Sequence, residues 1–251
     1  MVQSLDVAFI RMPDAPVPIV VVLDFDGTIT THDTSDALFS EYGDFHRLIK
    51  QLLNGSLTVA EYYTAAFASL SSDCTPDSLN QWLEQRTVDA GFVGLITWLR
   101  SKNIPVRIVS DGFDFYIHPI LQRVGVSTLS VSCNTVCWTG ERFVPAYPHA
   151  SDGCTCFSAS CKRNAVLRGV ADDVVIVYVG DGRSDTCAVQ HADVVFAKDY
   201  LAAWCTEQRI PHHPFKTLAD VQRILASSLQ LGKLKQRHQA ALARRNAYME
   251  E

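Results

Sequence analysis

The sequence predicts an α/β protein: a Rossmann-like, three-layer core built on a parallel sheet, with an inserted helical cap domain. Three observations support this class. Five apolar runs rich in Val and Ile are typical of strands, helical patterns separate them, and one long stretch is helical throughout. The five runs are residues 18–25, 105–109, 126–131, 174–179 and 193–196.

The strands and the helices between them fit a sheet that is covered on both faces. Residues 18–25 and 174–179 are almost wholly apolar, as in a parallel strand buried on each side. Residues 92–103 have apolar side chains at helical spacing and end before a proline. Residues 162–169 end at Gly169, a common helix stop.

The stretch between the first two strands predicts a cap domain over residues 33–90. Four helical patterns follow one another there without a strand-like run. Thr58, Thr75 and Asp77 are candidates for N-caps or first-turn residues of these helices.

The rest of the chain forms the core and its additions. We expect a core over 17–32 and 91–225, with an insertion at 133–160 and a C-terminal helix over 226–251. The insertion begins with a predicted β-hairpin around Thr139–Gly140 and continues into a cysteine-bearing loop. The C-terminal helix can pack on the core or mediate a homodimer, and the sequence leaves both open.

Composition and charge describe an ordinary globular protein and exclude two classes of partner. The chain has 251 residues, 47% hydrophobic and 20% charged, with a net charge of −5. Lys and Arg do not cluster as in proteins that bind nucleic acid or anionic membranes. No apolar run reaches the roughly 18 residues of a membrane helix, and residues 1–16 lack signal-peptide features. We therefore expect a cytoplasmic location.

Four short polar signals lie at the ends of predicted strands, whose carboxyl ends share one edge of a parallel sheet. The first, DFDGT, sets Asp24 and Asp26 two residues apart where the chain turns at Gly27. One carboxylate of such a pair can be a nucleophile, and the other can donate and accept a proton. Their mutual repulsion calls for a cation nearby.

The second and third signals supply groups that bind anions. We expect Ser110 to end a strand, with its hydroxyl and the free backbone N–H groups of Asp111 and Gly112 forming an anion cradle at a helix start. Lys162 begins a helical pattern and can neutralise phosphate oxygens and the nucleophile. The alternative cations near strand ends are Lys102, Arg163 and Lys198.

The fourth signal, GDGRSD, carries Asp181 and Asp185 four residues apart across a glycine-containing turn. Such oxygen donors suit a hard cation that retains water, so we expect Mg²⁺. Asp185 is alternatively the N-cap of the next helix. Arg183 either reaches the substrate or is a solvated turn residue.

The four motifs, in this order, resemble those of the haloacid dehalogenase superfamily phosphatases, and the helical insertion matches the cap of the phosphoserine phosphatase-like branch. The resemblance implies that Asp24 attacks phosphorus and becomes an aspartyl phosphate. It implies that Asp26 protonates the leaving alcohol and then activates water, while Ser110 and Lys162 hold the phosphoryl oxygens. The residues that it assigns to Mg²⁺ are Asp24, the backbone carbonyl of Asp26, Asp181 and, as a support, Asp185.

A narrower resemblance follows from the run that starts at VGDGRSD and from the acid at Asp33. Both are similar to the methionine-salvage branch, whose members act on 2-hydroxy-3-keto-5-methylthiopentenyl phosphate. Asp33 thereby becomes a candidate to face the substrate, with a helix N-cap as the alternative. The Cys161–Lys162 pair is shared with phosphoethanolamine/phosphocholine phosphatases, and Ser184 stands where phosphoserine phosphatases usually have Asn.

The sequence SDGCTCFSASCK brings Cys154, Cys156 and Cys161 close together along the chain. Structural zinc sites usually show paired CxxC motifs, which this spacing is not. We expect reduced thiols here, with a metal site and a disulfide as the alternatives. Cys187 lies in a helical pattern and is expected to be a small core residue.

Together these features predict a Mg²⁺-dependent phosphomonoester hydrolase for a small phosphorylated metabolite that fits under the closed cap. The best candidate is the methionine-salvage phosphate. Alternatives are a phosphoserine, phosphocholine or phosphoethanolamine phosphatase, or a phosphotransferase. An alternative of another class is a non-catalytic phosphometabolite-binding protein. Such a protein does not need a nucleophile beside a proton donor, so the paired acids argue against it.

Overall fold

A computed structural model describes residues 17–151, 154 and 156–249 of the chain. Residues 1–16, where we expect no signal peptide, lie outside the described part. Among the described residues, none of the helices has both the length and the apolar composition that a membrane span requires.

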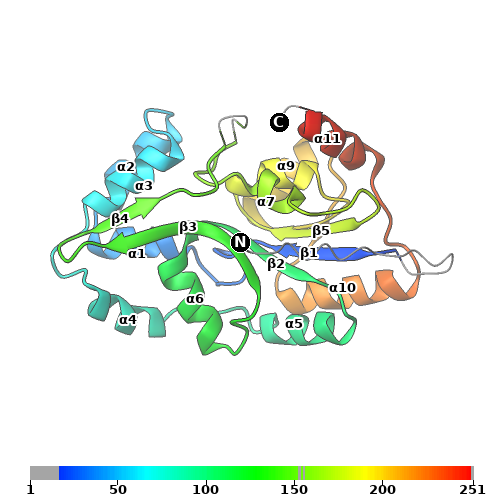
Figure 1. The fold of residues 1–251 in the computed structure, drawn as a ribbon, viewed down its shortest axis with the longest axis horizontal. Coiled ribbons are helices and arrows are strands. Elements are labelled where there is room, and N and C mark those ends of the chain that lie inside the picture. Colours follow the sequence, from blue (N-terminus) through cyan, green and yellow to red (C-terminus); the bar gives the residue numbers. More distant parts are fainter. Residues whose placement is uncertain (1–16, 152–153, 155, 250–251) are drawn as a thin grey trace, which may run out of the picture.

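The core is a seven-stranded sheet in the order β4-β3-β2-β1-β5-β6-β7 (Figure 1). All neighbouring strands pair in parallel except β3 and β4, which form the predicted antiparallel hairpin. The strands are β1 Ile19–Leu23, β2 Val106–Phe113, β3 Ser130–Trp138, β4 Phe143–Ala146, β5 Val175–Gly180, β6 Val194–Ala197 and β7 His213–Pro214.

Helices cover both faces of this sheet and complete three layers, as predicted. On one face lie α5 (Phe92–Ser101), α6 (Asp114–Arg123) and α10 (Leu218–Gln230) (Figure 1). On the other lie α7 (Lys162–Leu167), α8 (Thr186–Gln190), α9 (Asp199–Glu207) and α11 (His238–Met249). The central strands β1 and β5 are nearly inaccessible because both their faces are packed.

The inserted cap consists of four helices between β1 and α5: α1 Thr34–Tyr42, α2 Phe45–Leu53, α3 Val59–Ala68 and α4 Pro76–Glu84. Thr58 and Thr75 are N-caps of α3 and α4, and each closes a capping box. Tyr147, after the hairpin, donates a hydrogen bond to the Ala60 carbonyl at 2.9 Å. The hairpin side of the core therefore contacts the cap directly.

Two expected elements differ from those in the structure. The strand expected at 126–131 begins at Ser130 and runs on to Trp138, because it continues into the hairpin. The expected single C-terminal helix over 226–251 is two helices, α10 and α11. Gly232, with φ of 60°, ends α10 in the left-handed conformation that glycine adopts without strain.

Candidate active site

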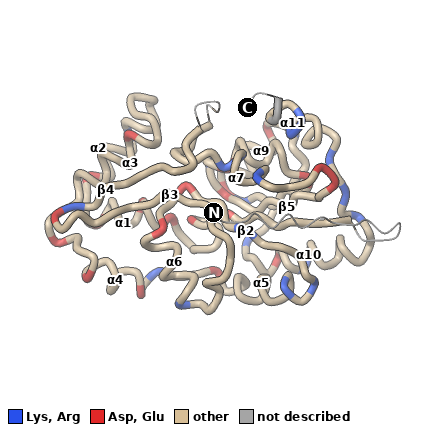
Figure 2. Tube along the Cα trace, viewed as in Figure 1, with Lys and Arg blue, Asp and Glu red and all other residues tan. Residues whose placement is uncertain are grey.

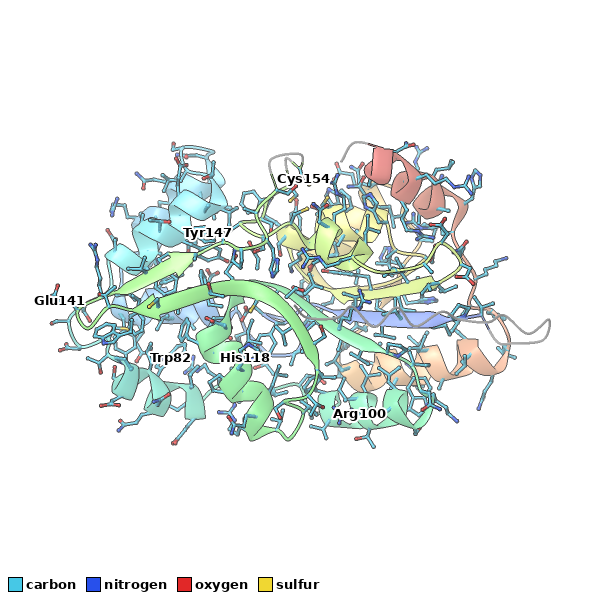
Figure 3. All side chains as sticks on the ribbon, viewed as in Figure 1. Trp82, Arg100, His118, Glu141, Tyr147 and Cys154 are labelled. Atoms are coloured by element: carbon cyan, nitrogen blue, oxygen red, sulfur yellow. The ribbon has the colours of Figure 1, made fainter. Side chains whose placement is uncertain are left out.

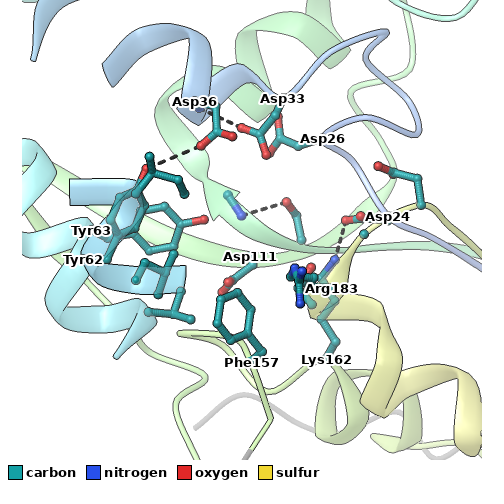
Figure 4. A pocket seen from close by; sticks show the side chains of 18 of the residues that line it. Asp24, Asp26, Asp33, Asp36, Tyr62, Tyr63, Asp111, Phe157, Lys162 and Arg183 are labelled. Atoms are coloured by element: carbon teal, nitrogen blue, oxygen red, sulfur yellow. Dashed lines mark hydrogen bonds and ion pairs between the residues drawn. The ribbon is translucent and has the colours of Figure 1, made fainter. Parts of the chain in front are cut away.

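A cavity of about 280 Å³ opens where the carboxyl ends of the central strands meet the cap. Charged and hydroxyl groups from the core line one part of it, and side chains of α2 and α3 line another (Figure 4). The core residues that line it are Asp24, Asp26, Ser110, Asp111, Gly112, Lys162, Asp181, Gly182, Arg183 and Ser184. All four polar motifs of the sequence thus reach the same cavity.

Asp24 and Asp26 follow β1 and have unlike partners. Asp24 is paired with the Lys162 ammonium at 2.6 Å, and both side chains are buried. Asp26 instead accepts hydrogen bonds from the Tyr116 hydroxyl and from the Thr34 backbone N–H, the latter at 2.9 Å. Among the described residues, the Lys162 ammonium pairs with Asp24, and Asp26 has neutral hydrogen-bond donors instead.

Burial raises the pKa of both acids, and for Asp24 the nearby Asp185 carboxylate adds to the rise while the Lys162 ammonium opposes it. Burial raises the pKa of Asp26 to about 7, and the nearby Asp33 carboxylate adds to this shift. Burial alone would lower the pKa of Lys162, but the carboxylates of Asp185 and Asp24 raise it above its ordinary value. Lys162 is therefore a permanent ammonium, and Asp26 can exchange a proton near neutral pH.

Asp185 is fully buried and holds Lys162 in position. One of its oxygens accepts from the Lys162 ammonium and from the Tyr178 hydroxyl, each at 2.7 Å. Its other oxygen accepts from the backbone N–H groups of Asp181 and Gly182, at 3.0 and 2.9 Å. Both oxygens thus have hydrogen-bond partners, and Asp185 shapes the turn that carries Asp181. It precedes α8 but makes no side-chain hydrogen bond that caps this helix, which differs from the alternative expected for it.

Asp181 provides an oxygen that can face a metal ion. The Thr28 hydroxyl donates to one oxygen of its carboxylate. One oxygen each of Asp24, Asp181 and Asp185 lies within 4.8 Å of the other two. Three carboxylates against the single ammonium of Lys162 leave two negative charges unmatched when all are ionised. This hard oxygen set and its surplus charge fit a divalent cation such as Mg²⁺.

The anion cradle expected after Ser110 has a different form. Strand β2 continues to Phe113, so the helix starts at Asp114 and not directly after Ser110. The N–H of Gly112 is not free, because it donates to the Ser110 hydroxyl oxygen at 2.9 Å. Ser110 itself lines the cavity and is buried.

Asp111 ties the loop before α7 to the core. Its carboxylate accepts from the backbone N–H groups of Ala159 and Ser160, both at 2.9 Å. The Asn134 side chain donates to the Asp111 carbonyl at 2.6 Å. A carboxylate in this position would repel a phosphoryl group, so its side chain positions the loop.

Asp33 and Arg183 both line the cavity, and contact with a substrate stays a prediction for each. Asp33 is the N-cap of α1, accepting from the Asp36 N–H at 2.8 Å, and it also lines the cavity. Arg183 lines the cavity while its guanidinium lies 4.1 Å over the Tyr200 ring and donates to the Tyr200 hydroxyl at 3.1 Å.

Several lining residues were missed by sequence reasoning. Figure 4 shows Asp36 beside Asp33 and Asp26, with the Tyr62 hydroxyl directed to the Asp36 carboxylate and with Tyr63 and Phe157 on other sides of the cavity. Asp36 had a signal, since it lies one helical turn after Asp33. The aromatic residues had no such signal in the sequence, because helical periodicity does not show which face of a cap helix meets a cavity.

Acidic and basic residues are distributed differently over the molecule. Figure 2 shows several Asp and Glu positions between the cap and the ends of the central strands and others on α3 and α4, whereas many Lys and Arg positions lie on α5, α11 and the segment before α11. The cavity thus needs the local cations described above to receive an anionic substrate.

The family model of the haloacid dehalogenase-like hydrolases matches residues 21–190. Relatives named 2-hydroxy-3-keto-5-methylthiopentenyl-1-phosphate phosphatase include one from Exiguobacterium sibiricum, 34% identical over 80% of this chain and 93% of its own. Another, from Geobacillus kaustophilus, is 31% identical over 81% of this chain and 93% of its own.

Solved structures share the fold. A phosphoserine phosphatase described as a phospho-aspartyl intermediate analogue has a TM-score of 0.63 at 18% identity, covering 84% of this chain and 98% of that one. A hydrolase from Salmonella enterica serovar Typhi, assigned to the same family, has a TM-score of 0.62 at 16% identity, covering 85% of this chain and 72% of that one. At these identities the likeness concerns the fold alone.

The buried contacts of Asp185 lead to a test of stability. Asp185→Ala leaves the Tyr178 hydroxyl and two backbone N–H groups without their acceptor and removes one partner of Lys162. We expect a loss of about 3–5 kcal/mol in the free energy of unfolding, measured by urea denaturation. The exposed Asp173 is the control, and Asp173→Ala should change stability by less than about 0.5 kcal/mol. Equal stability of the two variants would contradict the anchoring role of Asp185.

Proposed function

This chain is a phosphatase of the haloacid dehalogenase-like hydrolase family, and we propose that it hydrolyses a small phosphorylated metabolite with Asp24 as the nucleophile. One observation carries the proposal. Two carboxylates share a cavity, and one is paired with a buried ammonium while the other has neutral hydrogen-bond donors and a pKa of about 7. These are the environments that a nucleophile and a proton-transfer group require.

The reaction has two displacements at phosphorus. In the first, an Asp24 oxygen forms a bond to phosphorus, the ester P–O bond breaks, and Asp26 gives its proton to the leaving alcohol. In the second, Asp26 takes a proton from water as the water oxygen bonds to phosphorus, and Asp24 leaves as a carboxylate. Lys162 and Ser110 neutralise and orient the phosphoryl oxygens in both steps.

The residues that would hold Mg²⁺ are Asp24, Asp181 and the backbone carbonyl of Asp26, with Asp185 shaping the turn that carries Asp181. Bound there, the ion neutralises negative charge on the phosphoryl group and the nucleophile. Arg183 lies at the same cavity and supplies a second positive charge toward the substrate.

We propose that the substrate is 2-hydroxy-3-keto-5-methylthiopentenyl-1-phosphate or a closely related phosphate. The names of relatives support this, as does the cavity itself. One part of its wall is apolar, formed by Ile49, Leu52, Leu53 and Val59 of the cap, with Phe157 from the loop before α7. A volume of about 280 Å³ suits a small metabolite, and the apolar wall suits a thioether tail.

A second candidate is a phosphorylated amino alcohol such as phosphocholine or phosphoethanolamine. Asp33 and Asp36 lie at the cavity together with Tyr62 and Tyr63, and carboxylates beside aromatic rings attract ammonium groups. Burial and the neighbouring Asp33 raise the pKa of Asp36 to about 8, which weakens this attraction near neutral pH.

The homodimer, the cytoplasmic location and transfer of the phosphoryl group to an acceptor other than water stay predictions.

Loss of the nucleophile tests the proposed chemistry. Asp24→Asn should lower kcat for p-nitrophenyl phosphate by at least about a thousandfold, because no other side chain can replace the attacking oxygen. Wild-type activity should disappear on dialysis without Mg²⁺ and return when Mg²⁺ is added. A wild-type protein that binds phosphate esters but releases no phosphate would instead be a binding module.

A substitution at Gly112 tests whether the position of the Asp26 carboxylate matters for turnover. A Cβ at this position would overlap the Tyr116 hydroxyl and the Asp26 carboxylate. Gly112→Ala should lower kcat by about a hundredfold, the effect of moving a reacting group by about 1 Å. Gly94, in α5, is the control, because a Cβ there has its nearest neighbour at 3.6 Å. Gly94→Ala should keep full activity, and equal kcat values for both variants would contradict the account.

Variants of the apolar wall test which substrate the cavity accepts. Leu53, 59% exposed, lines the cavity, and Leu231, 61% exposed, lies outside it. Leu53→Asn should lower kcat/KM for the methylthio substrate by about tenfold and leave phosphoethanolamine turnover unchanged, whereas Leu231→Asn should alter neither. A wild-type preference for phosphocholine or phosphoethanolamine over the methylthio compound would favour the second candidate.

A further inference from the structure

Four cysteines from three segments meet behind the loop that carries Phe157. Cys154 and Cys156 belong to this loop, Cys161 is the N-cap of α7, and Cys187 lies in α8. Figure 3 shows Cys154 on the loop beside α7. This cluster lies outside the residues assigned to the reaction.

The sulfur atoms are close to one another as a group and not only as pairs. The Sγ atoms of Cys154 and Cys187 are 3.5 Å apart, and those of Cys154, Cys156 and Cys187 all lie within 4.8 Å of one another. The Cys161 thiol lies beside this group and interacts with the thiols of Cys156 and Cys187, although its Sγ is not within 4.8 Å of all three other sulfur atoms. Each thiol therefore has at least two sulfur neighbours.

This spacing matches a metal site better than a disulfide. Four thiolates at about 2.3 Å from a tetrahedral Zn²⁺ are about 3.8 Å from one another. A disulfide needs two sulfur atoms at about 2.05 Å, whereas the Sγ atoms of Cys154 and Cys187 are 3.5 Å apart. All four are free thiols in the structure.

We propose that Cys154, Cys156, Cys161 and Cys187 bind one Zn²⁺ in a closed, structural, four-thiolate site. Each thiol gives up its proton to solvent on binding, and the resulting charge of −2 lies near buried cationic side chains. Cys161 and Arg163 both lie near the His191 ring, and Arg163 is buried. Cys187, expected from the sequence to be a core residue, is the ligand that completes the set.

The site would fix one wall of the active cavity. It joins α8 to the loop whose Phe157 lines the cavity and whose Ala159 and Ser160 are held by Asp111. Cys161 also directly precedes Lys162, so a metal there holds the start of α7. With four protein ligands, the ion has no open position for a substrate, and its role is structural.

Metal content of the full chain, purified without an affinity tag or chelator and dialysed against Mg²⁺, tests this proposal. We expect one zinc per chain by plasma mass spectrometry. Replacing zinc with Co²⁺ should give the intense near-ultraviolet bands of thiolate-to-cobalt charge transfer, which carboxylate ligands do not produce.

Matched variants separate this site from the carboxylates. Cys187→Ser, and Cys154→Ser in the loop in case the first fails to fold, should lose the zinc and the cobalt bands. Cys205→Ser, a buried cysteine of α9 outside the cluster, should keep both. The proposal is overturned if wild type reconstituted with Zn²⁺ holds none, if zinc is lost only in Asp181→Asn, or if mass spectrometry finds a disulfide among the four cysteines.

Discussion

The active cavity is organised around one buried ammonium. Lys162 is 1% exposed and contacts the carboxylates of Asp24 at 2.6 Å and Asp185 at 2.7 Å. An isolated buried charge costs several kcal/mol, so this ion is tolerable only because both acids accompany it. The three residues come from the end of β1, the start of α7 and the turn after β5. The carboxyl ends of the parallel strands β1 and β5 lie side by side, Lys162 joins them from the start of α7, and the ion pairs then fix the direction of the Asp24 carboxylate.

The second acid is kept outside this arrangement by the backbone. The turn after Asp24 needs Gly27, whose φ is 73° and where a Cβ would overlap the Asp181 carboxylate. On the other side, only a glycine at 112 leaves room for Asp26 and the Tyr116 hydroxyl. Two identical side chains therefore have unlike partners within a few ångströms, which is how one cavity can hold both a nucleophile and a proton-transfer group.

Much of this could be predicted from sequence, because apolar strand runs and the polar residues at their ends are local signals. The central strands, the hairpin, the helical cap and the convergence of Asp24, Asp26, Lys162 and Asp181 were accessible in this way. The roles of Asp111 and Asp185 were not, since both depend on backbone N–H groups of loops whose path is set by tertiary contacts. The same holds for Cys187: its neighbours are cysteines from another segment, and helical periodicity made it a core residue.

The central claim is that Asp24 carries the phosphoryl group during turnover. It is tested most directly by mixing the enzyme with substrate, quenching in acid, reducing with borohydride and digesting for mass spectrometry. Borohydride reduces an acyl phosphate to an alcohol, so the modified residue marks the nucleophile. We predict modification at Asp24 and at no other carboxylate. Modification of a different residue, or none at all while phosphate is being released, would contradict it.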